Sequence, residues 1–202
     1  MVQVPVRSPE AVTGRARRAP AVADPAEEIF DNVEVRDTDE RCLTAASGAA
    51  PLVNSHDANV IQIVQTPGWV AIVGEKNHEA RIVRIGAGPE PALGSWSGVS
   101  VGRWEGATLV VTTTGLRPGV TKIIDNFYLS DRSRVTEWFT RTGPAEISYR
   151  FEVEDPTLFT QVWRAEEVFR ASEGLMYEYA CHEGNYSLPG ILAGGKTAAK
   201  AP

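Results

Sequence analysis

The chain consists mainly of short runs in which apolar and polar residues alternate, separated by Pro or Gly. The clearest run is 147–154, where Ile147, Tyr149, Phe151 and Val153 share one face and polar residues take the other. A period of two residues is typical of a strand with one buried face. Patterns of this kind predict nine strands, over residues 60–66, 69–74, 78–85, 97–104, 107–114, 134–142, 147–154, 158–169 and 175–181.

The connections between these runs are short, and Glu105-Gly106 is typical of a two-residue hairpin. No long amphipathic helix separates the runs, which disfavours a parallel βαβ plan. We therefore predict an all-β fold, an antiparallel lipocalin-like β-barrel of about eight to nine strands around one ligand cavity. A short helix is predicted over 188–193, after the last strand. The irregular connection 115–133 is the candidate lid.

Proline and small residues mark both ends of the chain, and four prolines fall within the first 25 residues. Such segments bury little apolar surface. We predict that residues 1–27 are disordered or loosely attached and that residues 28–193 form a single β-barrel domain. Residues 194–202 are expected to form a flexible tail.

Composition narrows the range of partners. The 202 residues are 43% hydrophobic, which is enough for a core, and 20 basic against 26 acidic residues give a formal charge of −6. Without a basic footprint, nucleic acid is not an expected partner. No apolar stretch approaches the roughly 20 residues that span a bilayer, so no membrane span is expected. We predict a monomer or a homodimer.

Cys42 and Cys181 are the only cysteines, and no CxxC pair indicates a structural zinc site. Arg17 and Arg18 are followed by a segment that is too short and too broken for the apolar region of a signal peptide. We therefore expect a cytoplasmic protein with two reduced thiols. A long-range disulfide is the alternative if the protein is exported.

Several motifs resemble a known family: Arg41-Cys42-Leu43, Gly102-Arg103-Trp104-Glu105-Gly106 and, at the end, Tyr-Glu-Tyr-Ala-Cys-His-Glu-Gly-Asn-Tyr over 177–186. They are similar to those of a widespread bacterial family of small proteins, functionally uncharacterised, many of which look exported. The resemblance covers roughly residues 40–195. This chain has Ala107 and Thr112 where that family has acidic residues, and Arg134 where it tends to have histidine.

The closing motif is also the densest group of candidate site residues. His182 or Glu183 is a candidate acid or base, and Asn185 or Tyr186 is a candidate hydrogen-bond donor at the mouth of the barrel. The alternative is a polar plug, whose side chains satisfy backbone groups where the chain leaves the barrel. A metal site formed by His56, His78, His182 and Glu183 lacks any helical pairing to organise it, so no metal is predicted.

The strands supply candidate residues for the cavity wall. Glu137 shares a face with Val135 and Phe139, so an inward apolar face would bury a carboxylate with a raised pKa. The alternative for Glu137 is an ion pair with an interior arginine such as Arg141 or Arg81. Further candidates on the cavity wall are His78 or Arg81, and Trp138 as aromatic surface. Tyr149 is a candidate hydrogen-bond donor to the substrate, and the alternative is a core tyrosine with its hydroxyl satisfied.

Two hypotheses for function follow. The first is a cofactor-independent acid/base enzyme, a cyclase, isomerase or lyase, acting on a small apolar molecule such as a secondary metabolite, with His182, Glu183, Glu137 and His78 as catalytic residues. Asn185, Tyr186, Tyr149, Trp138 and Arg81 would bind the substrate. The second is a non-catalytic lipocalin-like carrier of a hydrophobic small molecule.

Overall fold

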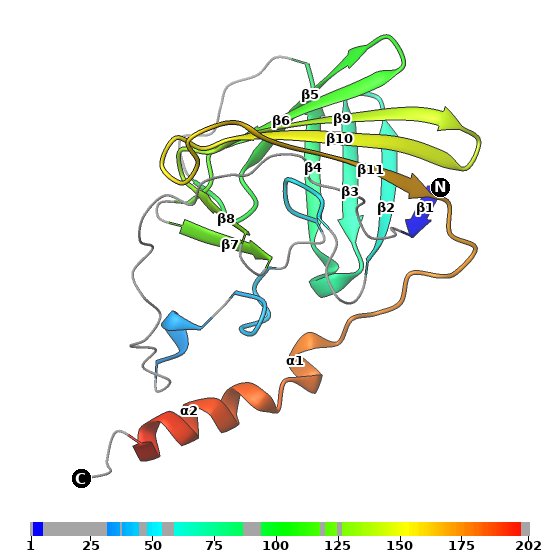
Figure 1. Cartoon of the computed structure of the whole chain (residues 1–202). Helices are drawn as coiled ribbons and strands as arrows, with labels where there is room; N and C mark the ends of the chain where they lie inside the picture. Colours follow the sequence, from blue (N-terminus) through cyan, green and yellow to red (C-terminus); the bar gives the residue numbers. More distant parts are fainter. Residues whose placement is uncertain are drawn as a thin grey trace.

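The computed structural model describes residues 2–5, 32–36, 38–44, 48–53, 59–86, 94–117, 120–124 and 127–198. Its centre is one curled β-sheet that forms a half-barrel (Figure 1). Eight strands make up this sheet: β2 (Val60–Thr66), β3 (Trp69–Gly74), β4 (Ala80–Ile85), β5 (Val99–Glu105), β6 (Thr108–Thr114), β9 (Arg134–Gly143), β10 (Glu146–Glu154) and β11 (Trp163–Arg170). The short strand β1 (Val2–Pro5) adds to the edge beside β2.

The prediction of a mostly β fold is confirmed, but the prediction of a closed barrel is wrong. The strand order is β1-β2-β3-β4-β5-β6-β9-β10-β11, with β1 and β11 as the two edges. These edges approach each other (Figure 1) without joining into one ladder. The edge strand β1 has four residues and ends at Pro5, which has no N–H to donate. The sheet therefore stays open at this seam.

The sheet is also not entirely antiparallel. Strands β4 and β5 pair in parallel, with Val83 opposite Ser100 and Ile85 opposite Gly102. A parallel pair cannot be joined by a tight hairpin and needs a long crossover. The connection over residues 86–98 supplies that length between the two strands. All other neighbouring strands of the sheet pair antiparallel.

Three two-residue hairpins lie at one end of the half-barrel. They are Pro67-Gly68 between β2 and β3, Gly106-Ala107 between β5 and β6, and Pro144-Ala145 between β9 and β10. Gly68 and Gly106 have φ angles of 82° and 60°, in the left-handed region that glycine adopts without a steric penalty. The register of the ladders places all three turns at the same end, which we call the hairpin end.

The core fills the concave face of the sheet, as the alternating pattern predicts. Along β10, Tyr149, Phe151 and Val153 are buried, while Arg150 and Glu154 are exposed. The same alternation buries inward residues of β3, β6, β9 and β11, among them Ile72, Val111, Val135 and Phe169. Several aromatic rings pack together in this core, and the ring centroids of Tyr149 and Phe169 are 4.7 Å apart.

Outside the main sheet, two sequence predictions need correction. The connection expected as an irregular lid contains strands β7 (Val120–Ile124) and β8 (Phe127–Ser130), which pair as a separate hairpin. The strand expected over 175–181 does not form: residues 175–180 have no regular secondary structure and pair with none of the described strands. The predicted C-terminal helix is confirmed as α2 (Ser187–Ala198), which continues beyond residue 193 into the expected tail. Of the N-terminal segment expected to be loosely attached, the structure describes only β1.

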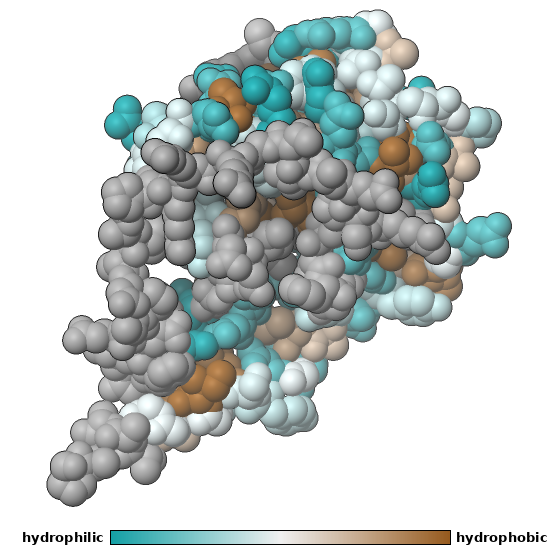
Figure 2. Space-filling view, viewed as in Figure 1, coloured by the Kyte–Doolittle hydropathy of each residue, from teal (hydrophilic) through white to brown (hydrophobic). Residues whose placement is uncertain are grey.

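The remaining elements are short: the 3-10 turns η2 (Val33–Val35) and η3 (Lys76–His78), and helix α1 (Cys181–Gly184). On the face shown in Figure 2, the described residues are mostly hydrophilic or intermediate, with hydrophobic residues in separate groups. None of the helices that the structure describes has the length and apolar character needed to cross a membrane.

Candidate functional site

A buried ion pair lies at the centre of the concave face. Glu137 on β9 and Arg81 on β4 both point inward, with 0% and 3% of their surfaces exposed. The curl of the sheet brings the two strands together across the core, although β5 and β6 separate them in the ladder. The guanidinium is bidentate: its NH2 group donates to Glu137 Oε1 at 2.9 Å, and its NH1 group donates to Oε2. Glu137 thus faces inward, as the alternation predicts, and the arginine paired with it is Arg81.

Tyr149 and two hydroxyls extend this pair into a network. The Tyr149 hydroxyl donates to Glu137 Oε1 at 2.8 Å and accepts the backbone N–H of Leu52, also at 2.8 Å. On the other side, Arg81 reaches the Thr113 hydroxyl at 3.5 Å, and Thr113 bonds Ser100 at 2.7 Å. Within the described part of the chain, the buried Nε of Arg81 has no hydrogen-bond partner.

The electrostatics of this network favour a structural role. Burial opposes the charged form of Arg81, but the neighbouring Glu137 carboxylate outweighs it, and the net result is a raised pKa. Burial, followed by the charge of Glu137, raises the pKa of Tyr149 well above its usual value. Arg81 therefore stays charged and Tyr149 stays protonated near neutral pH. This matches the ion-pair alternative for Glu137.

A separate cavity of about 350 Å³ opens at the hairpin end of the half-barrel. Its floor includes the buried side chains of Ile72, Leu109 and Phe139, and the half-exposed Trp104 lies at its rim. The Phe139 ring packs on Tyr149 with centroids 5.0 Å apart. The polar network therefore contacts the buried side of a residue that lines the cavity. The described residues that line it are Ile63, Gln65, Val70, Ile72, Trp104, Ala107, Leu109, Phe139, Arg141 and Ile147.

The closing motif lies away from this cavity, beside the turn between β3 and β4. There, the Tyr177 N–H donates to Glu75 Oε1 at 3.0 Å, and Lys76 lies over the Tyr179 ring. The connection between β3 and β4 is at the end of the sheet opposite the hairpin end. His182 and Glu183 are exposed on α1, whereas Glu137 is enclosed in the core. The structure therefore does not bring the motif and Glu137 into one pocket.

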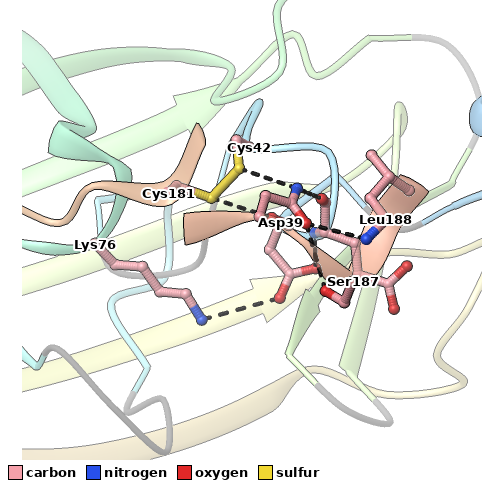
Figure 3. The surroundings of a disulfide bond; sticks show 8 residues. Asp39, Cys42, Lys76, Cys181, Ser187 and Leu188 are labelled. Carbon is pink, nitrogen blue, oxygen red and sulfur yellow. Dashed lines mark hydrogen bonds and ion pairs between the residues drawn. A yellow bond between two sulfur atoms is a disulfide. The ribbon is translucent and has the colours of Figure 1, made fainter. Parts of the chain in front are cut away.

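The motif is held in place by a disulfide (Figure 3). Cys42 and Cys181 are bonded, with their Cα atoms 5.8 Å apart, so the expectation of two reduced thiols is wrong. Next to the disulfide, the Asn185 amide donates to the Glu40 carbonyl at 2.7 Å. The Asn185 Oδ1 accepts the N–H of Leu188 at 3.2 Å, in the first turn of α2. Asn185 thus binds backbone groups, as the polar-plug alternative predicts.

The other predicted site residues are dispersed. His78 does not open a strand but is exposed in the turn η3. Trp138 points to the outer face, where the Arg150 guanidinium lies 4.2 Å from its ring centroid. Tyr186 is 85% exposed. His56 lies outside the described residues. No group of three or more metal-ligating side chains occurs among the residues that the structure describes.

Glu167 is a further buried carboxylate, which was not among the residues predicted from the sequence. This inward-facing residue of β11 lies opposite Tyr149 of β10 and is 8% exposed. Burial raises its pKa to about 7, and its Oε2 has no hydrogen-bond partner in the described structure. The available signal was the alternation of Trp163, Ala165, Glu167 and Phe169 on one face of β11. A buried carboxyl that titrates near neutral pH is suited to proton transfer.

No family model, no curated protein and no solved structure matches the chain. The resemblance to a bacterial family therefore rests on the sequence motifs alone.

Proposed function

We propose that the protein binds one small, largely apolar molecule in the cavity at the hairpin end of the half-barrel. The observation that carries this proposal is the lining, in which eight of ten residues are apolar and two, Gln65 and Arg141, are polar. Ligand sites commonly combine apolar walls with a few placed polar groups, at volumes from about 300 Å³ upward. The cavity of about 350 Å³ fits this description for a small ligand.

The cavity is supported by a rigid core. Its wall residues Val70 and Ile72 are each 1% exposed, and Phe139 packs against the hydrogen-bonded Tyr149. A site that exists before binding loses less conformational entropy when a ligand enters. A ligand that covers the exposed apolar surface of Trp104 would bind more tightly, because removing apolar area from water is favourable.

An acid/base enzyme is the second candidate function, and Glu167 is the observation that favours it. Leu109 and Phe139 line the cavity, and the same cross-strand row continues through Tyr149 to Glu167. The lining residues that the structure describes include no carboxylate or histidine. Binding is therefore the better supported function, and catalysis without a cofactor would need Glu167 to reach the ligand.

The disulfide bears on where this function is carried out. Disulfides persist in oxidising compartments and are rare in a reducing cytoplasm. The Cys42–Cys181 bond thus favours an oxidising compartment over the cytoplasmic location expected from the sequence.

The proposal is tested by titrating the protein with the neutral fluorescent probe N-phenyl-naphthylamine. We expect saturable binding and at least about tenfold weaker binding in Ala107→Trp, because the indole ring would occupy part of the cavity volume that the probe fills. Ala107 lines the cavity, whereas Ala80 is exposed on the outer face of β4, so Ala80→Trp is the matched control and should bind as wild type does. Unsaturable binding, or equal affinity in both variants, contradicts the proposal.

A bound molecule recovered from the native protein then separates carrier from enzyme. Mass spectrometry after incubation shows whether that molecule is converted. Conversion that Glu167→Gln abolishes without a loss of affinity supports the enzyme, whereas an unchanged ligand supports the carrier.

A further inference from the structure

We infer that the cavity selects apolar molecules that carry a carboxylate, and that Arg141 binds this group at the cavity mouth. The inference rests on the proposed function, because it specifies the ligand of the same cavity. Arg141 is the single charged residue among the ten that line the cavity. It lies near the end of β9, next to the hairpin, while the buried Phe139 on the same face forms part of the floor.

The hairpin fixes the guanidinium in position. Nε of Arg141 donates to the Gly143 carbonyl at 3.0 Å, and its NH2 group donates to the Pro144 carbonyl at 2.9 Å. A guanidinium has five N–H donors, so three remain for other partners. A side chain that is already ordered loses less rotamer entropy when it binds a ligand. These two bonds therefore hold Arg141 ready for an acceptor at the mouth.

The charge of Arg141 is not neutralised by a carboxylate in the described part of the chain. The other strand arginines near a carboxylate show the contrast: Arg103 pairs with Glu105 at 2.7 Å, and Arg164 pairs with Glu152 at 2.8 Å. Arg141 bonds only the two hairpin carbonyls among the described residues. An unpaired arginine beside an apolar cavity is complementary to a ligand that has an apolar body and an anionic end.

A carboxylate fits these donors better than a neutral or cationic group. Hydrogen bonds between guanidinium and carboxylate are charge-assisted and about twice as strong as neutral ones. Gln65, the other polar residue of the lining, lies on β2 and offers an amide donor. The floor contributes only apolar surface, so the polar end of a ligand is directed toward the mouth.

The first experiment compares three ligands of equal chain length on the wild-type protein: decanoate, decanol and decylamine. We expect decanoate to bind roughly tenfold more tightly than decanol, and decylamine to bind most weakly. The decanoate advantage should shrink as salt is added, because an exposed charge is screened. Equal binding of decanoate and decanol overturns the inference and leaves the proposed function intact. Absence of binding by all three overturns the proposed function as well.

The second experiment assigns the preference to Arg141. In Arg141→Gln we expect the decanoate advantage to be lost while decanol binds as before. The matched control is Arg164→Gln, which removes the same charge from an exposed arginine on β11 outside the cavity and should keep the full preference. If Arg141→Gln weakens both ligands equally, Arg141 only shapes the hairpin and the inference is wrong. Thermal unfolding of each variant confirms that the fold is retained.

Discussion

Replacing Glu137 with glutamine should destabilise the whole fold, because the change leaves a buried positive charge without its partner. Glu137 is the only carboxylate that hydrogen-bonds Arg81 in the described structure, and both side chains are almost fully enclosed. Glutamine keeps the shape of the side chain but removes the charge. Its amide nitrogen would also face the guanidinium or the Tyr149 hydroxyl, where the carboxylate accepted hydrogen bonds.

The expected cost is about 3–5 kcal/mol, the range found when one member of a buried ion pair is removed. A domain of ordinary stability has about 5–15 kcal/mol in total. Glu137→Gln would therefore remove a large part of the stability. Among the described residues, Arg81 would keep only the glutamine oxygen and the 3.5 Å contact to the Thr113 hydroxyl as acceptors, and its Nε already has no partner. The exposed pair of Arg164 and Glu152 gives the contrast, since surface pairs contribute about 0–1 kcal/mol.

The assay is urea unfolding followed by tryptophan fluorescence and circular dichroism. Glu152→Gln is the control and should stay within about 1 kcal/mol of wild type. A double variant, Arg81→Met with Glu137→Leu, should lose less stability than Glu137→Gln alone, because it removes both charges together. If Glu137→Gln unfolds at the wild-type urea concentration, the buried pair does not stabilise the fold as we argue. Loss of turnover in such a stable variant would instead assign Glu137 to catalysis.

Three further outcomes follow from the described contacts. Tyr149→Phe should cost about 1–3 kcal/mol, because the buried Leu52 N–H loses its acceptor; urea unfolding measures this. Thiol titration of unreduced, denatured protein should find no free thiol, and two after reduction. Burial raises the pKa of Glu167 to about 7 in the folded state, compared with an ordinary value of 4.5. Between pH 4.5 and pH 7 the folded state therefore keeps a proton that the unfolded state has lost. The free energy of unfolding should therefore fall as pH rises through this range, by up to about 3 kcal/mol. In Glu167→Gln this pH-dependent fall should disappear, whereas the exposed control Glu166→Gln should keep it.

Alternation within single strands predicted the part of the site that depends on local geometry. The inward placement of Glu137 with Val135 and Phe139, and of Tyr149 with Phe151, is confirmed because a strand with one buried face fixes the side of every second residue. The same rule applied to β11 would have found Glu167. Local pattern was therefore sufficient to identify inward polar residues, but not their partners.

Contacts between distant strands were beyond the reach of the sequence. Arg81 and Glu137 are 56 residues apart and meet only because the sheet curls, and sequence reasoning named Arg141 before Arg81 as an inward partner. The parallel pairing of β4 with β5 depends on the path of a long connection. The cysteines are 139 residues apart, and spacing alone does not show whether two such residues meet.

The closing motif shows why a dense group of polar residues is a weak indicator of chemistry. Residues 171–180, which follow β11, pair with none of the described strands, so their backbone groups need hydrogen-bond partners outside the sheet. Asn185 satisfies the Glu40 carbonyl and the Leu188 N–H, and Glu75 accepts the Tyr177 N–H. These bonds account for Asn185 in the motif and for Glu75 beside it without any ligand. By the same reasoning, chemistry is best sought where polar groups inside the half-barrel keep unused hydrogen-bonding capacity, as Glu167 does in the core and Arg141 does in the cavity lining.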